Sequence, residues 1–134
     1  MKLLLDTHIW IWSLLEPSRL DARVRQALED RRNELWLSPV STWELVVLVQ
    51  KKRVVLGEHL ESWLEKARAA APLREALLSH DIAAASGDVD LPHPDPADRF
   101  LVATARMLDL TLVTADERLI RSKQIRTMRN RAAG

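Results

Sequence analysis

The chain has 134 residues, of which 47% are apolar, which fits a single domain, here residues 1–134, with a hydrophobic core. The absence of cysteine excludes disulfides, zinc sites built on thiolates and thiol nucleophiles, and it fits a cytoplasmic protein. A formal net charge of +1, with an isoelectric point near 8.2, neither requires nor excludes a nucleic-acid partner.

The N-terminal segment is predicted to be a buried strand followed by a short helix. Residues 2–6 form an apolar run closed by Asp6, the pattern of a strand covered on both faces, and Thr7–Leu15 is expected to be helical. Because Asp6 and His8 interrupt the apolar stretch and no small-residue cleavage site follows, we do not expect a signal peptide. No uninterrupted apolar run reaches about 18 residues, so no membrane span is expected either.

The next segments are predicted to be helix, strand and helix. The first helix is expected over 18–33, with Ser18 as its N-cap and Asp21 in the capping-box position. Residues 35–38 form a short apolar strand. Residues 39–52 are then expected to be helical, because proline at the first position suits a first helical turn.

The middle of the chain continues the alternation. After a break at Gly57, residues 58–71 are rich in Ala, Leu, Glu and Lys and are expected to form a helix that ends before Pro72. A strand is expected over 73–78 and a short helix over 79–86. This order of elements is typical of βαβ units.

The C-terminal third is predicted to start with a loop over 87–96, which contains three prolines. A helix over 97–109, a strand over 110–114, a helical turn over 117–121 and a weak strand over 125–128 follow. Strands separated by helices predict right-handed βαβ units and an α/β fold with a mainly parallel central sheet.

Four carboxylates lie where a folding argument would not place them. Asp6 ends the first strand, and Asp116 follows the strand over 110–114. Glu44 and Asp98 each lie within the apolar stripe of a predicted helix. Because an unpaired charge is costly to bury, these positions indicate a shared function.

Topology predicts that the four carboxylates meet. In parallel α/β sheets, sites lie beyond the carboxyl ends of the strands, where Asp6 and Asp116 leave the sheet and where the helices of Glu44 and Asp98 begin. Ligation by oxygen alone suits a hard cation such as Mg²⁺ or Mn²⁺. A carboxylate-bound metal can activate water and stabilise a phosphoryl transition state, so the reaction class is phosphodiester hydrolysis.

Four successive motifs carry a resemblance to a known family. They are Leu4–His8 (LLDTH), Ser41–Glu44 (STWE), His93–Ala103 (HPDPADRFLVA) and Leu112–Asp116 (LVTAD). In order and spacing they resemble the motifs of PIN-domain ribonucleases, above all the VapC-type toxins of bacterial toxin–antitoxin pairs. The resemblance implies a three-layer α/β/α sandwich, Mg²⁺ or Mn²⁺ dependence and cleavage of single-stranded RNA. It also implies homodimerisation and inhibition by a small antitoxin protein.

The resemblance assigns roles to the four carboxylates. Asp6, Glu44, Asp98 and Asp116 match the acidic quartet of the family. Asp6 and Asp98 are assigned as direct metal ligands and Asp116 as a weaker one. Glu44 is assigned either to bind the metal through water or to orient the attacking water.

Two residues near the quartet are assigned supporting roles, and a third competes with one of its members for the role of metal ligand. Thr114 is expected to hydrogen-bond a carboxylate or the scissile phosphate, and Arg99 to contact RNA. Asp95 competes with Asp98 for the ligand role, but it lies between two prolines and off the helical stripe, so we interpret it as a loop residue.

Each carboxylate also has a purely structural explanation. Asp6 and Asp116 are placed to cap the helical segments that follow them. Glu44 and Asp98 are placed to favour a helix dipole, and Asp98 is also placed to pair with Arg99. Only their joint occurrence separates the functional hypothesis from these explanations.

Other features suggest surfaces. The helix around Glu44 is apolar almost all round and is expected to bury against a second copy or an antitoxin. The tryptophans are candidates for base stacking or for the core. Basic residues towards the C-terminus either hold a phosphate backbone or, past Met128, belong to a solvated, frayed end. The tryptophans are Trp10, Trp12, Trp36, Trp43 and Trp63, and the basic residues are Arg118, Arg121, Lys123, Arg126, Arg129 and Arg131.

Two other functions compete with a metal-dependent endoribonuclease toxin. One is a catalytically silent RNA- or protein-binding module on the same fold, which metal-dependent cleavage would rule out. The other is a receiver-like signalling domain, which also has acidic strand ends. The sequence lacks the paired acid after the first strand and the lysine after the last strand that such a domain needs.

Overall fold

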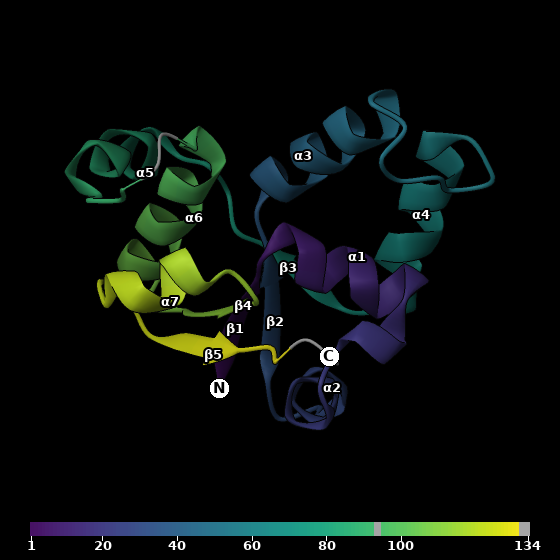
Figure 1. The fold of residues 1–134 in the computed structure, drawn as a ribbon, viewed down its shortest axis with the longest axis horizontal. Helices are drawn as coiled ribbons and strands as arrows, with labels where there is room; N and C mark the ends of the chain where they lie inside the picture. Colours follow the sequence, from purple (N-terminus) through teal and green to yellow (C-terminus); the bar gives the residue numbers. More distant parts are fainter. Residues whose placement is uncertain (93–94, 132–134) are drawn as a thin grey trace.

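The computed structural model describes residues 1–92 and 95–131, which are built around a five-stranded sheet (Figure 1). The strands lie in the order β3-β2-β1-β4-β5, and every neighbouring pair is parallel. The predicted α/β fold is therefore confirmed. The strands are β1 (Lys2–Leu5), β2 (Glu34–Leu37), β3 (Leu73–Glu75), β4 (Thr111–Thr114) and β5 (Thr127–Arg129).

Helices cover both faces of the sheet and give the three layers. In Figure 1, α1 to α4 lie to the right of the sheet and α5 to α7 to the left. Among the described residues, no helix is long and apolar enough to cross a membrane. The helices are α1 (Thr7–Leu15), α2 (Ala22–Glu29), α3 (Pro39–Gln50), α4 (Leu60–Ala70), α5 (His80–Ala85), α6 (Pro96–Met107) and α7 (Glu117–Ser122), with 3₁₀ turns η1 (Pro17–Arg19) and η2 (Ser86–Asp88).

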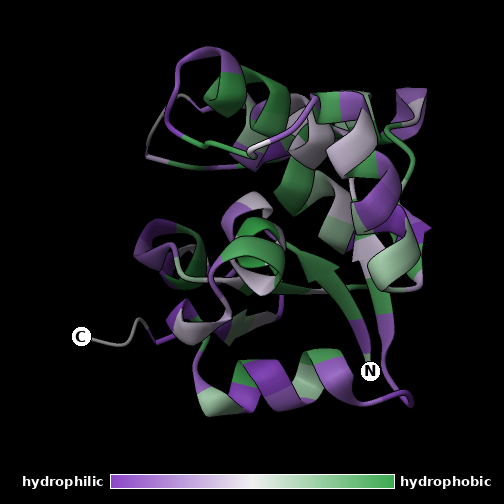
Figure 2. Cartoon of the chain, turned by 90° about the vertical axis from the view of Figure 1, so that its right-hand side faces the viewer, coloured by the Kyte–Doolittle hydropathy of each residue, from purple (hydrophilic) through white to green (hydrophobic). Residues whose placement is uncertain are grey.

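Strand alternation divides the core into two clusters. Leu3 and Leu5 point to the cluster that contains residues of α1, α2 and α4, whereas Leu4 points to the cluster formed with α5 and α6. Because both faces of β1 are covered, its sequence is a continuous apolar run. Figure 2 shows the middle of the sheet largely in the colour of hydrophobic residues, whereas the surface helix α2, at the bottom, alternates between the two colours.

The register brings the ends of β1 and β4 to the same edge of the sheet. Leu3 is opposite Thr111 and Leu5 is opposite Val113. The amide of Asp6 continues the pairing by donating to the carbonyl of Val113 at 3.0 Å. Side chains that follow these two strands therefore start from neighbouring positions.

The predicted start of the second helix is wrong. Ser18 lies in η1, and Asp21, rather than Ser18, is the N-cap of α2, with its Oδ1 accepting from the Val24 amide at 2.8 Å. Pro17 favours a separate tight turn, because its ring fixes the backbone angle φ. Leu20, which follows this turn, is buried. The third strand is also shorter than predicted, and Leu77 beyond its end is 62% exposed.

The C-terminal segment is ordered further than expected. The last strand is β5, which extends to Arg129, so the alternative of a frayed end past Met128 does not hold for the described residues. Asn130 is 2% exposed, accepts from the Asp21 amide at 2.8 Å and donates to the carbonyl of Arg19 at 3.1 Å. This side chain fastens the end of the chain between η1 and α2.

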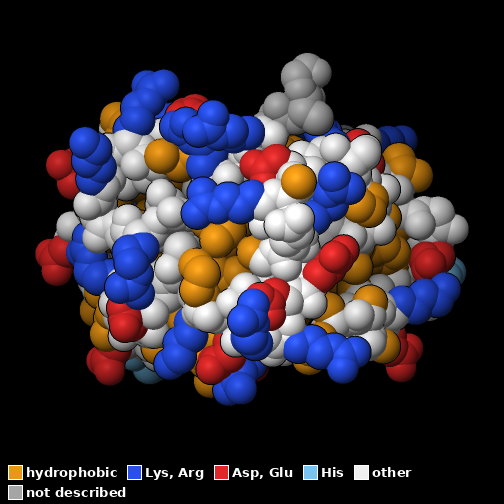
Figure 3. Space-filling view, turned by 90° about the horizontal axis from the view of Figure 1, so that it is seen from below, with side chains coloured by type: hydrophobic (Ala, Val, Ile, Leu, Met, Phe, Trp, Pro, Cys, Tyr) orange, Lys and Arg blue, Asp and Glu red, His pale blue; other side chains and the backbone are white. Residues whose placement is uncertain are grey.

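Two of the arginines near this end are paired with acids. Arg126 lies 2.7 Å from Asp109, and Arg129 lies 2.7 Å from Glu117. The face in Figure 3 accordingly shows Lys and Arg side chains interspersed with Asp and Glu. The described charges do not form a single uninterrupted basic track there.

Candidate active site

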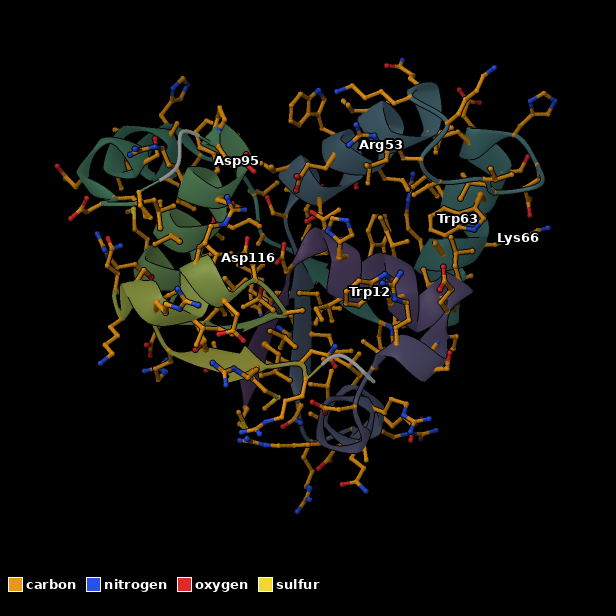
Figure 4. All side chains as sticks on the ribbon, in the orientation of Figure 1. Trp12, Arg53, Trp63, Lys66, Asp95 and Asp116 are labelled. Carbon is orange, nitrogen blue, oxygen red and sulfur yellow. The ribbon has the colours of Figure 1, made fainter. Side chains whose placement is uncertain are left out.

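A cleft of about 350 Å³ at the carboxyl ends of β1 and β4 gathers the acidic residues. All four predicted carboxylates line it, together with Asp95, for which the sequence predicts a loop position. In Figure 4, Asp95 and Asp116 both lie on the side of α6 and α7 that faces α1 and α3. The lining residues are Asp6, His8, Trp12, Glu44, Asp95, Asp98, Ala115, Asp116 and Arg118.

Asp6 is buried and held by two hydrogen bonds. As the N-cap of α1, it accepts from the Thr7 amide through Oδ1 at 2.8 Å, and it accepts from the Thr114 hydroxyl through Oδ2 at 2.6 Å. Burial raises the pKa of Asp6 above its ordinary value, and the nearby charge of Asp116 adds to this effect. The two hydrogen bonds and the charge of His8 act in the opposite direction.

Two buried hydroxyls connect α1 to α3. The hydroxyl of Thr7 donates to Oε1 of Glu44, and Thr7 Oγ1 also lies 2.9 Å from the hydroxyl oxygen of Ser41. Both hydroxyl-bearing residues are buried, at 1% and 0% exposure. Thr7, which follows Asp6, therefore orients the carboxylate of Glu44 on a different helix. No sequence pattern indicates this arrangement.

The pKa of Glu44 lies well above the ordinary value of a glutamate. Desolvation by burial raises its pKa from 4.5 to about 7, and the charges of Asp6, Asp95 and Asp98 add to the rise. The hydrogen bond from Thr7 opposes the rise. At neutral pH this group therefore exchanges a proton readily and senses the charge of its neighbours.

Asp95 and Asp98 both come from the beginning of α6. Asp95 is its N-cap and accepts from the Ala97 amide at 3.0 Å, and Pro96 occupies the first helical position. Asp98 lies in the first turn and is 7% exposed. The Asp-Pro pair is the sequence signal for such a cap, and the capping side chain of Asp95 also lines the cleft.

Arg99 points elsewhere. Its Nη1 donates to the carbonyl of Val89 at 2.6 Å, and Arg99 is not among the residues that line the cleft. The geometry gives no support to the predicted contact between Arg99 and RNA. His93 and Pro94, which belong to the same sequence motif, lie outside the described residues.

Asp116 is both a helix cap and half of an ion pair. It caps α7 by accepting from the Arg118 amide at 2.9 Å, as its structural explanation expected. The Arg118 guanidinium donates two hydrogen bonds to the same carboxylate, with Nε 3.2 Å from Oδ1 and Nη2 3.0 Å from Oδ2. This contact raises the pKa of Arg118, which remains a cation at the rim of an acidic cleft.

The donor set fits a hard divalent cation by its chemistry. The cleft offers carboxylate oxygens on five side chains, and their mutual repulsion contributes to the raised pKa of Glu44. Within the described ranges 1–92 and 95–131, no three histidine or carboxylate side chains already form a metal-binding group. The carboxylates would therefore have to close around a cation to hold it.

The sequence matches the PIN domain family over residues 3–124. The chain is also 36% identical over 117 residues to Ribonuclease VapC22 of Mycobacterium tuberculosis, an alignment that covers 87% of this chain and 88% of that protein. These similarities extend over nearly the whole of the described structure.

Solved structures share the fold at low sequence identity. VapBC2 from Rickettsia felis, crystallised with a DNA fragment from its promoter, superposes with a TM-score of 0.75 at 18% identity, covering 98% of this chain and 100% of that chain. DNA-bound VapBC from Salmonella typhimurium gives a TM-score of 0.70 at 16% identity, covering 96% of this chain and 98% of that chain. At these identities the likeness concerns the fold alone.

Proposed function

The chain belongs to the PIN-domain family and, within it, to the VapC ribonucleases, and from this premise we propose that it is a Mg²⁺- or Mn²⁺-dependent endoribonuclease. Its substrate is single-stranded RNA, and its biological role is that of the toxin of a toxin–antitoxin pair. Membership of this family leaves no basis for the receiver-like alternative.

One observation carries the metal-dependent mechanism. Five carboxylates from four separate segments line one cleft, and the charges of Asp6, Asp95 and Asp98 help to raise the pKa of Glu44 to about 7. A fold gains nothing in stability from concentrating like charges in this way. A bound cation would neutralise them.

In the proposed mechanism, Asp6, Asp98 and Asp116 would hold the cation, and Glu44 would accept a proton. When bound, the metal supplies Lewis acidity towards the phosphate and promotes ionisation of water. Glu44 accepts the proton of the attacking water, because a pKa near 7 suits a general base at neutral pH. Thr7 and Thr114 hold Glu44 and Asp6 in place through their hydroxyls.

Asp116 has two states in this mechanism. In the described geometry its carboxylate is held by Arg118. A bound cation would compete with Arg118 for this carboxylate, and Arg118 would then be available to a phosphate of the RNA. The ion pair with Arg118 supports the assignment of Asp116 as the weaker ligand.

We also propose a protein partner. The related structures from Rickettsia felis and Salmonella typhimurium are VapBC complexes, which supports an antitoxin as the partner of this chain. A homodimer is proposed from α3, where the large apolar side chain of Trp43 is 59% exposed.

The test is cleavage of a labelled single-stranded RNA by the purified protein, compared with a fully base-paired RNA of the same sequence. Internal cuts in the single strand support the proposal. The alternative, a catalytically silent RNA-binding module on the same fold, predicts that RNA is bound in the presence of Mg²⁺ or Mn²⁺ and recovered intact.

A further inference from the structure

We propose that Trp12, flanked by His8 and Arg19, is the platform on which a nucleobase beside the scissile phosphate stacks. The inference rests on the proposed ribonuclease function and adds the path of the RNA across the cleft. We call these three side chains the α1 strip, because Trp12 and His8 lie on α1 and Arg19 lies in η1 directly after it.

The α1 strip is continuous with the acidic cleft. His8 and Trp12 both line the cleft, with their ring centroids 5.7 Å apart and their planes tilted by 52°. The guanidinium carbon of Arg19 lies 4.5 Å from the centroid of the Trp12 ring. The three groups therefore form a row that begins at the carboxylates and leads away from them.

Exposure makes the α1 strip accessible to a ligand. His8 is exposed, Trp12 is half-buried, and the side chain of Arg19 is 53% exposed. The anionic partner of Arg19 is the surface residue Glu16, at 3.8 Å, a distance at which an exposed ion pair contributes little. The guanidinium can therefore turn from Glu16 to a phosphate at small cost.

Electrostatics explains why the RNA needs such a strip. The carboxylates repel the phosphate backbone, and His8 and Arg118 are the basic side chains among the described residues that line the cleft. Arg118 approaches from α7, on the side of Asp116, whereas Trp12 lies on α1 across from it (Figure 4). Stacking does not depend on phosphate charge, so an aromatic ring can hold a base where the backbone is repelled.

The chain provides a matched control outside the cleft. Trp36 is also half-buried, and the guanidinium carbon of Arg74 lies 5.8 Å from the centroid of its ring. Trp36 packs against the core, as Trp12 does, but it does not line the cleft. Removing either indole should destabilise the fold to a comparable extent, whereas only the removal of Trp12 should weaken RNA binding.

The experiment compares Trp12→Ala with Trp36→Ala in two assays. In single-turnover cleavage with Mg²⁺, the protein concentration needed for half the maximal rate should rise about 5- to 150-fold for Trp12→Ala only, the range expected for one stacked base. In Asp98→Asn protein, which leaves RNA intact, the addition of Trp12→Ala should weaken RNA binding by the same factor. His8→Ala, an exposed change that leaves the core alone, should weaken binding in the same direction.

A second ligand separates stacking from structural damage. A strand of the same length without bases should bind equally to proteins with and without Trp12→Ala. Equal effects of Trp12→Ala and Trp36→Ala, or a weakening that persists with the strand without bases, would overturn the platform. If the wild type neither cleaves nor binds RNA, the proposed function itself fails, whereas cleavage that is indifferent to Trp12 removes only the platform. A Trp12→Ala protein that fails only to bind an antitoxin would assign the α1 strip to a protein partner instead.

Discussion

The hydroxyl of Thr114 donates to Oδ2 of Asp6 at 2.6 Å and so joins the carboxyl ends of β4 and β1. The oxygen of that hydroxyl also accepts from the Asp116 amide at 3.0 Å. Thr114 is fully buried, so the donor is shielded from water. A single side chain therefore fixes the positions of two proposed metal ligands.

The first prediction concerns this hydroxyl. Thr114→Val should lower the free energy of unfolding by about 1–3 kcal/mol, because it leaves buried polar partners without their hydrogen bond. Since that bond lowers the pKa of Asp6, its removal should move the acidic limb of the rate–pH profile to higher pH. Thr114→Ser, which keeps the hydroxyl, is the control. A profile that does not move in Thr114→Val would remove the hydrogen bond from the mechanism.

The second prediction separates the two aspartates of α6. Asp98→Asn should abolish nearly all cleavage activity, because Asp98 is assigned as a direct ligand. Asp95→Asn should retain far more, because asparagine caps a helix about as well as aspartate. The measurement is the rate of RNA cleavage by each variant at saturating Mg²⁺. If Asp95→Asn is the inactive variant and Asp98→Asn is near wild type, the roles are reversed.

The third prediction follows from the raised pKa of Glu44. Its pKa rises from 4.5 when unfolded to about 7 when folded, so the folded state binds more protons in that window. This group's contribution to the stability of the metal-free protein therefore falls as pH rises from about 4.5 to 7 and is constant above. Glu44→Gln should flatten that part of the curve of unfolding free energy against pH. Parallel curves for the two proteins would contradict the raised pKa.

The fourth prediction concerns metal and stability together. Without metal, Asp98→Asn should melt at a higher temperature than wild type, because it removes one of the charges that repel in the cleft. Mg²⁺ at a hundredfold excess over its dissociation constant should stabilise the wild type by about 2.7 kcal/mol and the variant by little. Melting curves of both proteins, in EDTA and in Mg²⁺, provide the four melting temperatures that this comparison needs. A metal-free Asp98→Asn that is less stable than wild type would favour a purely structural role for Asp98.

The fifth prediction concerns salt. Removing one cation that binds a phosphate of a single strand should reduce the log–log slope of affinity against salt by about 0.7. Arg118→Gln, at the rim of the cleft, should show this reduction. Arg126→Gln should not, because Arg126 does not line the cleft. Equal slopes for wild type and Arg118→Gln would take Arg118 off the RNA path.

The parallel sheet and the meeting of four carboxylates could be predicted from the sequence because both follow from periodicity and topology. Continuous apolar runs indicated buried strands, and parallel strands place Asp6 and Asp116 at the same edge of the sheet, where β1 and β4 are neighbours. The resemblance to PIN-domain ribonucleases rested on the four motifs that contain these carboxylates, and the family match confirms it.

What could not be predicted depended on side-chain direction and on competing local turns. Asp95 lies off the helical stripe in sequence, which predicts a loop residue, yet its capping role turns it towards the cleft. Arg99 adjoins Asp98 in sequence, but its long side chain reaches Val89 instead. The hydrogen bond of Thr7 to Glu44 joins residues 37 positions apart, and no local pattern encodes it.

The central claim is that these carboxylates hold a divalent cation without which RNA is not cut. The most direct measurement is cleavage of one labelled single-stranded RNA by the same protein sample, first in EDTA and then after Mg²⁺ or Mn²⁺ is restored in excess. We predict no cleavage in EDTA, full recovery with either metal, and no recovery in Asp98→Asn. Undiminished cleavage by protein shown by elemental analysis to be free of metal would contradict the account.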